Sequence, residues 1–229
     1  MKTAVITFPG SNRQQDVMRA LQQATGTAPA AVWHGDHELP AGTDLVVLPG
    51  GFSYGDYLRC GAIAGHAEIM TAVRAHAARG GYVLGICNGF QILVESGLLP
   101  GILMRNAGLR FICKMQHLQV ATQNNDFTSL YKKGQVIKVC IAHGEGNYMA
   151  DEHTITALEE QDRVAFRYCH ADGTRTLGAN PNGSINDIAG ILSENRRVLG
   201  MMPHPENLIE DIMGGTDGRG LFASLAKAA

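Results

Sequence analysis

Residues 82–91 read YVLGICNGFQ. An apolar run stops at Cys87, and glycines stand two positions before it and two after it, at Gly85 and Gly89. This pattern predicts a buried strand that turns sharply into a helix, because the glycines relieve crowding at a tight turn. A side chain at such a turn is lifted out of the sheet, and the N–H groups that begin the helix point at whatever it attacks. The stretch therefore predicts a nucleophile elbow with cysteine as the nucleophile.

Strands and helices alternate on the N-terminal side of this elbow. Strands are predicted at 3–8, 30–33, 44–48 and 82–86, with helices at about 13–25 and 62–79. This alternation is typical of the α/β class, here a flavodoxin-like, doubly wound, mainly parallel sheet. Such sheets bind ligands at the carboxyl ends of their strands. The loops at 9–12, 49–56 and 87–91 all follow strands, so we expect them to share one rim.

The second half of the chain is richer in strands. Candidate strands lie at 109–120, 135–142, 164–168, 188–192 and 198–201, and a final helix is expected at about 219–228. The last of these strands leads into the loop MPHPE, residues 202–206. Prolines on both sides of His204 hold this loop rigid and extended. Glu206 is placed to orient the imidazole and to stabilise its charged form, which would complete a Cys-His-Glu set with Cys87. The alternative is a histidine that is merely packed or exposed.

Glycine-rich loops supply the remaining candidates. Gly50 and Gly51 follow a buried apolar strand, which is consistent either with a simple tight turn or with a backbone N–H that is directed at an oxyanion. In the second interpretation the N–H of Gly51 would act together with the N–H of Asn88. The segments AHGEG at 142–146 and NPNGS at 180–184 are, on pattern alone, turns.

Composition excludes several classes of function. The chain has 229 residues, and 19 Lys and Arg nearly balance 21 Asp and Glu, for a formal net charge of −2. This balance predicts neither nucleic-acid binding nor attachment to an anionic membrane. No apolar run approaches the ~20 residues of a membrane span. The first residues carry a single cation before a short apolar strand, which does not resemble a signal peptide.

The five cysteines are odd in number and widely spaced, and no pair forms a CxxC motif. This pattern fits free thiols in a reducing cytosol better than a disulfide or zinc framework, so a cytoplasmic location and no metal site are expected. Apart from Cys87, the cysteines are expected to be buried small hydrophobic residues. These are Cys60, Cys113, Cys140 and Cys169.

Together these motifs resemble the class I (triad) glutamine amidotransferases. Six segments occur in the order seen in one family of that class, the glutaminase subunit (subunit I) of phosphoribosylformylglycinamidine synthase. They are FPGSN at 8–12, PGGFSYGD at 49–56, GICNGFQ at 85–91, AHGEG at 142–146, NPNGS at 180–184 and MPHPE at 202–206. The GGTDG segment at 214–218 is also similar to that family. The resemblance covers nearly the whole chain, which implies a single amidotransferase domain over 1–229. One departure is Arg13, where the family usually has a cysteine.

The resemblance implies a role for each site residue. Cys87 would attack the side-chain amide of glutamine, with His204 as the base and Glu206 as its partner. The N–H groups of Gly51 and Asn88 would hold the oxyanion. The residues expected to hold the amino-acid end of glutamine are Gln91, Gly144 and Glu145. No cofactor is implied in this chain. ATP and Mg²⁺ would be used by a large synthetase subunit, and a small third subunit would complete the complex.

Three rival functions remain open from the residues. A cysteine peptidase or chaperone-like hydrolase of the same fold would lack the His-x-Glu loop late in the chain. A glutaminase that serves another acceptor, in an imidazole-glycerol or guanylate pathway, is allowed by the class motifs but disfavoured by the loops at 52–56 and 142–146. A non-catalytic regulatory subunit would have lost Cys87, His204 or Glu206, and all three are present.

Overall fold

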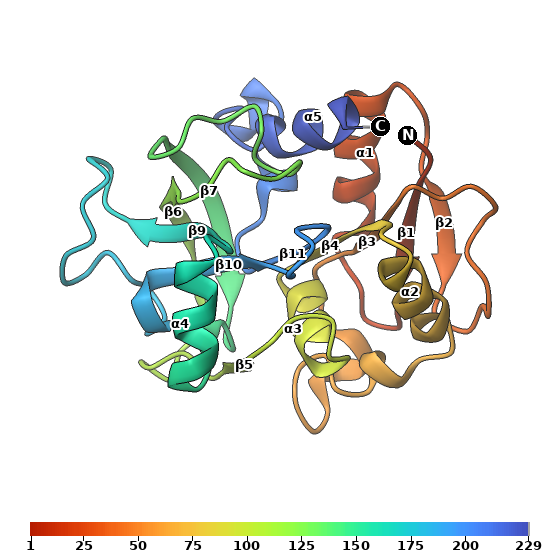
Figure 1. The fold of residues 1–229 in the computed structure, drawn as a ribbon, viewed down its shortest axis with the longest axis horizontal. Helices are drawn as coiled ribbons and strands as arrows, with labels where there is room; N and C mark the ends of the chain where they lie inside the picture. Colours follow the sequence, from red (N-terminus) through yellow and green to blue (C-terminus); the bar gives the residue numbers. More distant parts are fainter. Residues whose placement is uncertain (229) are drawn as a thin grey trace.

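The computed structural model describes residues 1–228, and within them a nine-stranded sheet forms the centre of the molecule (Figure 1). The strand order is β2-β1-β3-β4-β11-β10-β9-β6-β7. The strand bounds are β1 Thr3–Thr7, β2 Ala30–Trp33, β3 Leu45–Leu48, β4 Tyr82–Ile86, β6 Ile112–Val120, β7 Val136–His143, β9 Val164–Cys169, β10 Ile188–Leu192 and β11 Val198–Met201.

The five strands from β2 to β11 are parallel to one another. Their order is that of a flavodoxin-like sheet, and β3 and β4 are buried along their whole length. Strands covered on both faces need continuous apolar sequence, which explains the runs LVVL and YVLGI. The predicted α/β class is therefore confirmed.

The remaining strands extend this sheet in antiparallel fashion. β10 pairs antiparallel with β11 and with β9, and β6 pairs antiparallel with β9 and β7. An isolated bridge joins Cys140 of β7 to His204 in the loop after β11. The antiparallel half therefore reaches back to the rim on which the parallel strands end.

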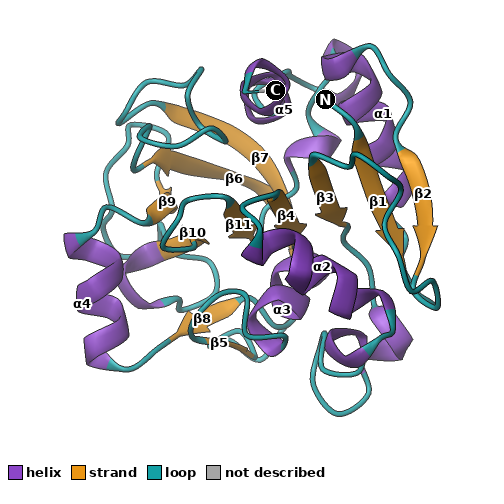
Figure 2. Cartoon of the chain, turned by 45° about the vertical axis from the view of Figure 1, so that its right-hand side comes forward, coloured by secondary structure: helices purple, strands orange, loops and turns teal. Residues whose placement is uncertain are grey.

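Helices cover both faces of the parallel strands (Figures 1 and 2). α1 Gln14–Thr25 and α5 Arg219–Lys227 pack together on one side, and α2 Ile69–Ala78 and α3 Asn88–Glu95 lie on the other. Glycines let α3 approach the sheet closely. A Cβ atom at Gly85 of β4 would lie 2.5 Å from a side-chain carbon of Leu93, and one at Gly200 of β11 would lie 2.1 Å from the Phe90 ring.

The helix predicted at about 62–79 is wrong in its first third. Ala64–His66 form a separate 3-10 turn, Ala67 is extended, and α2 begins at Ile69. The reason is tertiary packing against α3. A Cβ atom at Gly61 would lie 2.7 Å from the backbone nitrogen of Ile92, so the segment before α2 rests on α3 instead of continuing the helix.

Two strands and one helix were not expected from the sequence. They are the two-stranded pair β5 Ile102–Met104 and β8 Asn147–Met149, and the helix α4 Glu152–Glu160. Figure 2 shows the pair beside α3. A start signal for α4 was present, because the side chain of Asp151 accepts a hydrogen bond from the Thr154 N–H at 2.8 Å, as a helix N-cap does.

All five cysteines are free. Cys169 is buried, Cys60 and Cys140 are half-buried, and Cys113 is exposed. The expectation of a buried residue is therefore wrong for Cys113, which lies on the outward part of β6. Among residues 1–228 no helix is both long enough and apolar enough to cross a membrane.

Candidate active site

Cys87 stands alone between β4 and α3, in a backbone conformation that side chains rarely adopt. Its φ is 50° and its ψ is −106°, and the residue is 6% exposed. A non-glycine residue in such a region costs roughly 1–3 kcal/mol and persists only where the surroundings impose it. The predicted elbow is therefore present as a strained turn, with the sulfur held at the carboxyl edge of the sheet.

The neighbouring glycine explains how the turn is tolerated. A Cβ atom at Gly89 would lie 1.9 Å from the carbonyl oxygen of Leu48, at the end of β3. No side chain fits there, so glycine lets the first turn of α3 rest directly on the adjacent strand. The thiol of Cys87 donates to the carbonyl oxygen of Ala142 at 3.7 Å, so the end of β7 lies beside the sulfur.

His204 and Glu206 are delivered to the same place by the loop after β11. His204 Nδ1 lies 2.7 Å from Glu206 Oε1, and the residues are 2% and 0% exposed. The backbone N–H of His204 donates to the Cys140 carbonyl at 2.8 Å, which fixes the loop against β7. His204 Nε2 has no hydrogen-bond partner among residues 1–228, so it is available to a reacting group.

The surroundings of His204 favour its protonated form. Burial alone would lower the pKa of this imidazole, but the charge of Glu206 and the nearby sulfur of Cys87 raise it well above the usual value. The three side chains therefore act on one another electrostatically. A protonated imidazole beside a cysteine stabilises the negatively charged, nucleophilic form of the sulfur.

Two backbone N–H groups in the loops around Cys87 have no hydrogen-bond acceptor within residues 1–228. Neither the N–H of Gly51 nor that of Asn88 makes a hydrogen bond within residues 1–228. Gly51 has a φ of 152°, and a Cβ atom there would lie 2.7 Å from the backbone of Ser11. Only glycine fits this position. Free N–H groups at an elbow are suited to hold an oxyanion.

The loop after β1 braces the loop that contains Gly51. Phe52 N–H donates to the carbonyl of Gly10 at 2.9 Å, and Tyr54 N–H donates to that of Pro9 at 2.7 Å. In the other direction the N–H of Arg13 donates to the Gly50 carbonyl at 3.2 Å. This bond uses backbone atoms, which explains how the loop keeps its place although Arg13 departs from the family pattern.

A chain of side-chain hydrogen bonds links both glycine-rich loops to α3. Asn88 Oδ1 accepts from the Ser53 N–H at 3.1 Å, and Asn88 Nδ2 donates to Gln91 Oε1 at 2.9 Å. Gln91 Nε2 donates to the Glu145 carbonyl at 2.6 Å. The predicted residues Asn88, Gln91 and Glu145 are thus brought together. Gln91 links α3 to the turn at 144–146. Gly144 lies in the same turn, against the Phe111 ring.

Comparison with known proteins shows the family to which this chain belongs. The family description for the CobB/CobQ-like glutamine amidotransferase domain matches residues 1–216. Phosphoribosylformylglycinamidine synthase subunit PurQ of Bradyrhizobium diazoefficiens is 63% identical over 227 residues, which covers 99% of this chain and 97% of the relative. The chain belongs to the PurQ family of glutamine amidotransferases. The Rhodospirillum rubrum PurQ subunit is 59% identical over 228 residues, or 100% of this chain and 99% of that one.

A solved structure supports the PurQ assignment at the level of the fold. The structure of PurLQS from Thermotoga maritima matches with a TM-score of 0.86 and 39% identity, covering 99% of this chain and 98% of that one. A putative GMP synthase subunit of Thermoplasma acidophilum, 16% identical with a TM-score of 0.63, shares the fold alone. Rivals outside the amidotransferase class are therefore excluded by family membership.

Sequence reasoning missed a buried polar cluster beside the site of this PurQ-family chain. His143 and Asn182 were read only as turn residues, yet Asn182 Nδ2 lies 3.0 Å from His143 Nε2 and 3.1 Å from the Tyr168 hydroxyl. Burial raises the pKa of Tyr168, and the nearby sulfur of Cys87 raises it further. A histidine at the buried end of an alternating strand was the available signal.

An acidic pair near the turn at 144–146 was also missed. Burial raises the pKa of Asp56, a hydrogen bond with Cys60 opposes that shift, and the charge of Glu145 adds to it. Burial also raises the pKa of the Cys60 thiol, and both carboxylates add to the effect. Two carboxylates therefore lie close together at this edge of the site, and Arg105 Nε lies 3.7 Å from Glu145 Oε1.

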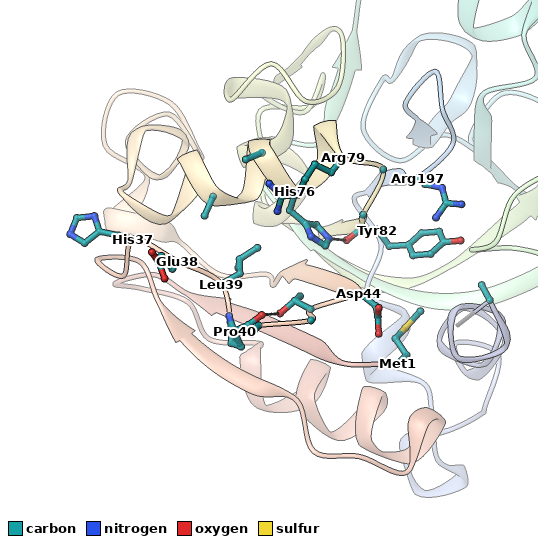
Figure 3. Close-up of a pocket in the computed structure, with 18 residues that line it drawn as sticks. Met1, His37, Glu38, Leu39, Pro40, Asp44, His76, Arg79, Tyr82 and Arg197 are labelled. Carbon is teal, nitrogen blue, oxygen red and sulfur yellow. Dashed lines mark hydrogen bonds between the residues drawn. The ribbon is translucent and has the colours of Figure 1, made fainter.

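A cavity of about 840 Å³ lies at the opposite end of the strands (Figure 3). Its lining includes His76, Arg79, Tyr82 and Arg197. Tyr82 begins β4 and Cys87 follows its end, so the two sites are separated by the length of a five-residue strand, about 17 Å. This cavity holds none of the predicted site residues, and the candidate active site is the rim around Cys87.

Within residues 1–228 no cluster of three or more His, Cys, Asp or Glu side chains is arranged to hold a metal ion.

Proposed function

We propose that this chain is the glutaminase subunit of phosphoribosylformylglycinamidine synthase, in purine biosynthesis, and that Cys87, His204 and Glu206 perform its chemistry. Family membership supports the reaction. The single observation that carries the residue assignment is the convergence of an elbow cysteine with a buried His204–Glu206 pair. In this proposal residues 1–229 act as one amidotransferase domain.

In the first half of the reaction, the sulfur of Cys87 attacks the side-chain amide carbon of glutamine. The N–H groups of Gly51 and Asn88 stabilise the oxyanion. The proton on His204 then passes to the amide nitrogen, the C–N bond breaks, and ammonia leaves a glutamyl thioester on Cys87. Glu206 keeps the imidazole oriented and stabilises its charge throughout.

In the second half, water attacks the thioester carbon and gives a proton to His204. The C–S bond breaks, the sulfur recovers that proton, and glutamate departs. The turn that contains Gly144 and Glu145, with Gln91 behind it, is placed to hold the amino-acid end of the substrate. The carboxylate of Glu145 suits the ammonium group of glutamine, because opposite charges attract at short range.

The partners follow from the relatives. PurLQS of Thermotoga maritima is by its name a three-component assembly. By analogy, this chain would pass ammonia to a large synthetase subunit that uses ATP and Mg²⁺ to convert formylglycinamide ribonucleotide to the amidine, with a small third subunit completing the complex. Neutral ammonia is the nucleophile, so a shielded transfer that prevents its protonation favours such an assembly. Five free thiols suit the cytoplasm, where we place this reaction.

Substitution of the nucleophile tests the assignment. In the reconstituted complex, Cys87→Ala should abolish synthesis from glutamine and leave synthesis from added ammonia intact, because the sulfur is needed only to release ammonia. Cys113→Ser is the matched control, since Cys113 is exposed on β6. A Cys87→Ala complex that uses glutamine at the wild-type rate would refute the proposal.

A further inference from the structure

His143 is a buried histidine whose two ring nitrogens have different surroundings. It closes β7 and is 3% exposed. Its Nε2 lies 3.0 Å from Asn182 Nδ2, whereas its Nδ1 has no hydrogen-bond partner among residues 1–228. A buried polar atom without a partner costs about 1–3 kcal/mol, so the unpartnered nitrogen needs a physical reason.

The neighbours of Asn182 fix the position of the proton on His143. Asn182 Oδ1 accepts from the N–H of Ser184 at 3.1 Å and from its hydroxyl at 2.8 Å, so the nitrogen of the amide must face His143. An amide NH₂ group only donates. The same nitrogen lies 2.8 Å from the Gly146 carbonyl oxygen and 3.1 Å from the Tyr168 hydroxyl, so its two hydrogens are shared among three acceptors. A proton on His143 Nε2 would face these hydrogens, so the neutral ring carries its proton on Nδ1.

The ring is also held neutral. Burial lowers the pKa of His143 to about 3, and the positive charge of His204 contributes to the shift. A second imidazolium beside His204 would repel the first, so a neutral ring avoids a like-charge contact in a buried site. His143 therefore presents an uncharged N–H donor from Nδ1.

The donor lies on the side of the ring that is not covered by the Gly146 turn. A Cβ atom at Gly146 would lie 2.2 Å from His143 Cδ2 and 2.4 Å from Nε2, so this turn covers one edge of the ring and Nδ1 lies on the other. The preceding carbonyl, that of Ala142, contacts the Cys87 thiol at 3.7 Å. The residue before His143 therefore contacts the Cys87 sulfur, and the charge of His204 acts on the His143 ring.

Two buried ring nitrogens in this region have no protein partner, and their chemistry is complementary. His143 Nδ1 offers a proton, and His204 Nε2, once it has given its proton to ammonia, accepts one. A water molecule has both a lone pair and a proton to offer, so it matches such a donor and acceptor together. A water placed in this way is needed only after the thioester has formed.

We propose that His143 Nδ1–H donates a hydrogen bond to the water that cleaves the glutamyl thioester, and thereby orients this water toward the thioester carbon. The inference rests on the proposed function. The O–C bond forms as the C–S bond breaks, and the water proton goes to His204 and then to the sulfur. His143 keeps its own proton, with Asn182 fixing the tautomer.

This role predicts a specific kinetic pattern. Thioester formation precedes the attack of water, and kcat/KM reports only the steps through thioester formation. Loss of the donor should lower kcat and KM by the same factor, about tenfold to hundredfold, with kcat/KM changed by less than about twofold. The glutamyl thioester on Cys87 should accumulate, and mass spectrometry of rapidly quenched complex would detect it as an adduct.

Substitutions by asparagine and by glutamine distinguish the roles of the two ring nitrogens of His143. In His143→Asn the amide nitrogen takes the place of Nδ1 and can still donate to water. In His143→Gln the amide oxygen can take the place of Nε2 and accept from Asn182, but no donor remains at the Nδ1 position. In the reconstituted complex, the Asn variant should keep kcat within about threefold of wild type, and the Gln variant should show the thioester pattern.

The opposite order of activities would overturn the proposal, because it would show that the contact with Asn182 alone is important. Equal activities of the two variants, or a fall in kcat/KM without thioester accumulation, would also overturn it. If both variants fail to fold, nitrogen NMR of histidine-labelled wild-type chain decides: a proton on Nδ1 of His143 supports the proposal, and a proton on Nε2 contradicts it.

The outcome is separable from that of the proposed function. If wild-type complex forms no adduct on Cys87 with glutamine and Cys87→Ala is fully active, the glutaminase assignment itself fails. If the adduct forms in wild type but does not accumulate in His143→Gln, only the role of His143 is excluded.

Discussion

His204 Nδ1 lies 2.7 Å from Glu206 Oε1, and neither residue is exposed to solvent by more than 2%. Burial opposes the charged imidazole, but the charge of Glu206 and the nearby sulfur of Cys87 hold the pKa of His204 well above its usual value. The imidazole of His204 therefore holds a proton that it can transfer to a reacting group at Cys87. Substitution of either residue leaves the other one buried without its partner. Because one is the base and the other a carboxylate, the two substitutions are expected to have different effects.

His204→Ala should remove glutaminase activity nearly as completely as loss of the thiol, because base and nucleophile act as one unit and their losses do not add. Glu206→Ala should be milder, since it removes orientation and charge stabilisation but leaves the base. We expect losses of about 10⁴-fold or more for the first and about 10²–10⁴-fold for the second. Steady-state glutamate release by the complex measures both, with the urea unfolding of each variant as the control for folding. Comparable rates for wild type and His204→Ala would place the base elsewhere.

Gly50→Ala should impair catalysis by displacing His204. A Cβ atom at Gly50 would lie 2.8 Å from His204 Cε1 and 3.3 Å from Arg13 Cγ, closer than normal packing allows. The imidazole must then shift from Cys87, and a misplacement of about 1 Å can cost roughly 10²-fold in rate. Gly108→Ala is the control, because nothing lies within 4 Å of that position. Wild-type kcat for Gly50→Ala would show that His204 tolerates the shift.

Much of the fold could be predicted because local patterns and tertiary structure agree. The elbow shows this best: the strand predicted at 82–86 is β4 Tyr82–Ile86, and Cys87 takes up a positive φ where the pattern required a sharp turn. The parallel strands β1, β3, β4 and β11 are buried along nearly their whole length, so apolar runs mark them clearly. The candidate triad residues were predicted in the same way, because the loops that carry them directly follow β4 and β11.

Other features depend on contacts that no local pattern encodes. The helix predicted from residue 62 fails because Gly61 packs onto α3, and β5 and β8 are three-residue strands that exist only as a pair. His143 ends β7 and Asn182 lies in a turn 39 positions later, so nothing in the sequence linked them. Buried polar clusters of this kind are set by tertiary structure.

The pKa of His143 predicts how stability changes with pH. Burial lowers this pKa to about 3 in the folded chain, whereas an exposed histidine titrates near 6.5. Below about pH 6.5, His143 binds a proton in the unfolded state but not in the folded state. The free energy of unfolding therefore falls as pH is lowered from about 6.5 toward 3. Between pH 6.5 and pH 5 the contribution of His143 to this loss is about 2 kcal/mol.

Urea unfolding of wild type and His143→Asn at pH 7 and pH 5 measures this contribution. The variant lacks the titrating ring, so its free energy of unfolding should fall less than that of wild type over this interval, by about 2 kcal/mol. His153→Asn is the control, because His153 is exposed on α4. Equal pH dependence in wild type and His143→Asn would show that the ring is not held neutral.

The loop that carries Gly51 predicts that the synthetase partner controls the rate. Just beyond Gly51, Tyr54, Asp56 and Leu58 all have positive φ values, of 52°, 57° and 70°. Non-glycine residues in this region store strain and are found in segments that change conformation at functional sites. Phe52, next to Gly51, is 45% exposed and forms an aromatic contact with the exposed Phe111. A partner that covers these rings would act directly on the oxyanion loop.

We therefore expect the free chain to hydrolyse glutamine slowly, and the nucleotide-loaded synthetase partner to raise the rate by about tenfold or more, which corresponds to about 1.4 kcal/mol of activation free energy. The time course of Cys87 labelling by a glutamine analogue, with and without the loaded partner, measures the effect at the thioester step. Labelling by iodoacetamide is the control, because alkylation does not require the oxyanion N–H groups. Partner-dependent labelling by the analogue, with partner-independent alkylation, would locate the control in the loop at 50–56. If the analogue labels Cys87 equally fast in both states, the oxyanion site is already complete in the free chain.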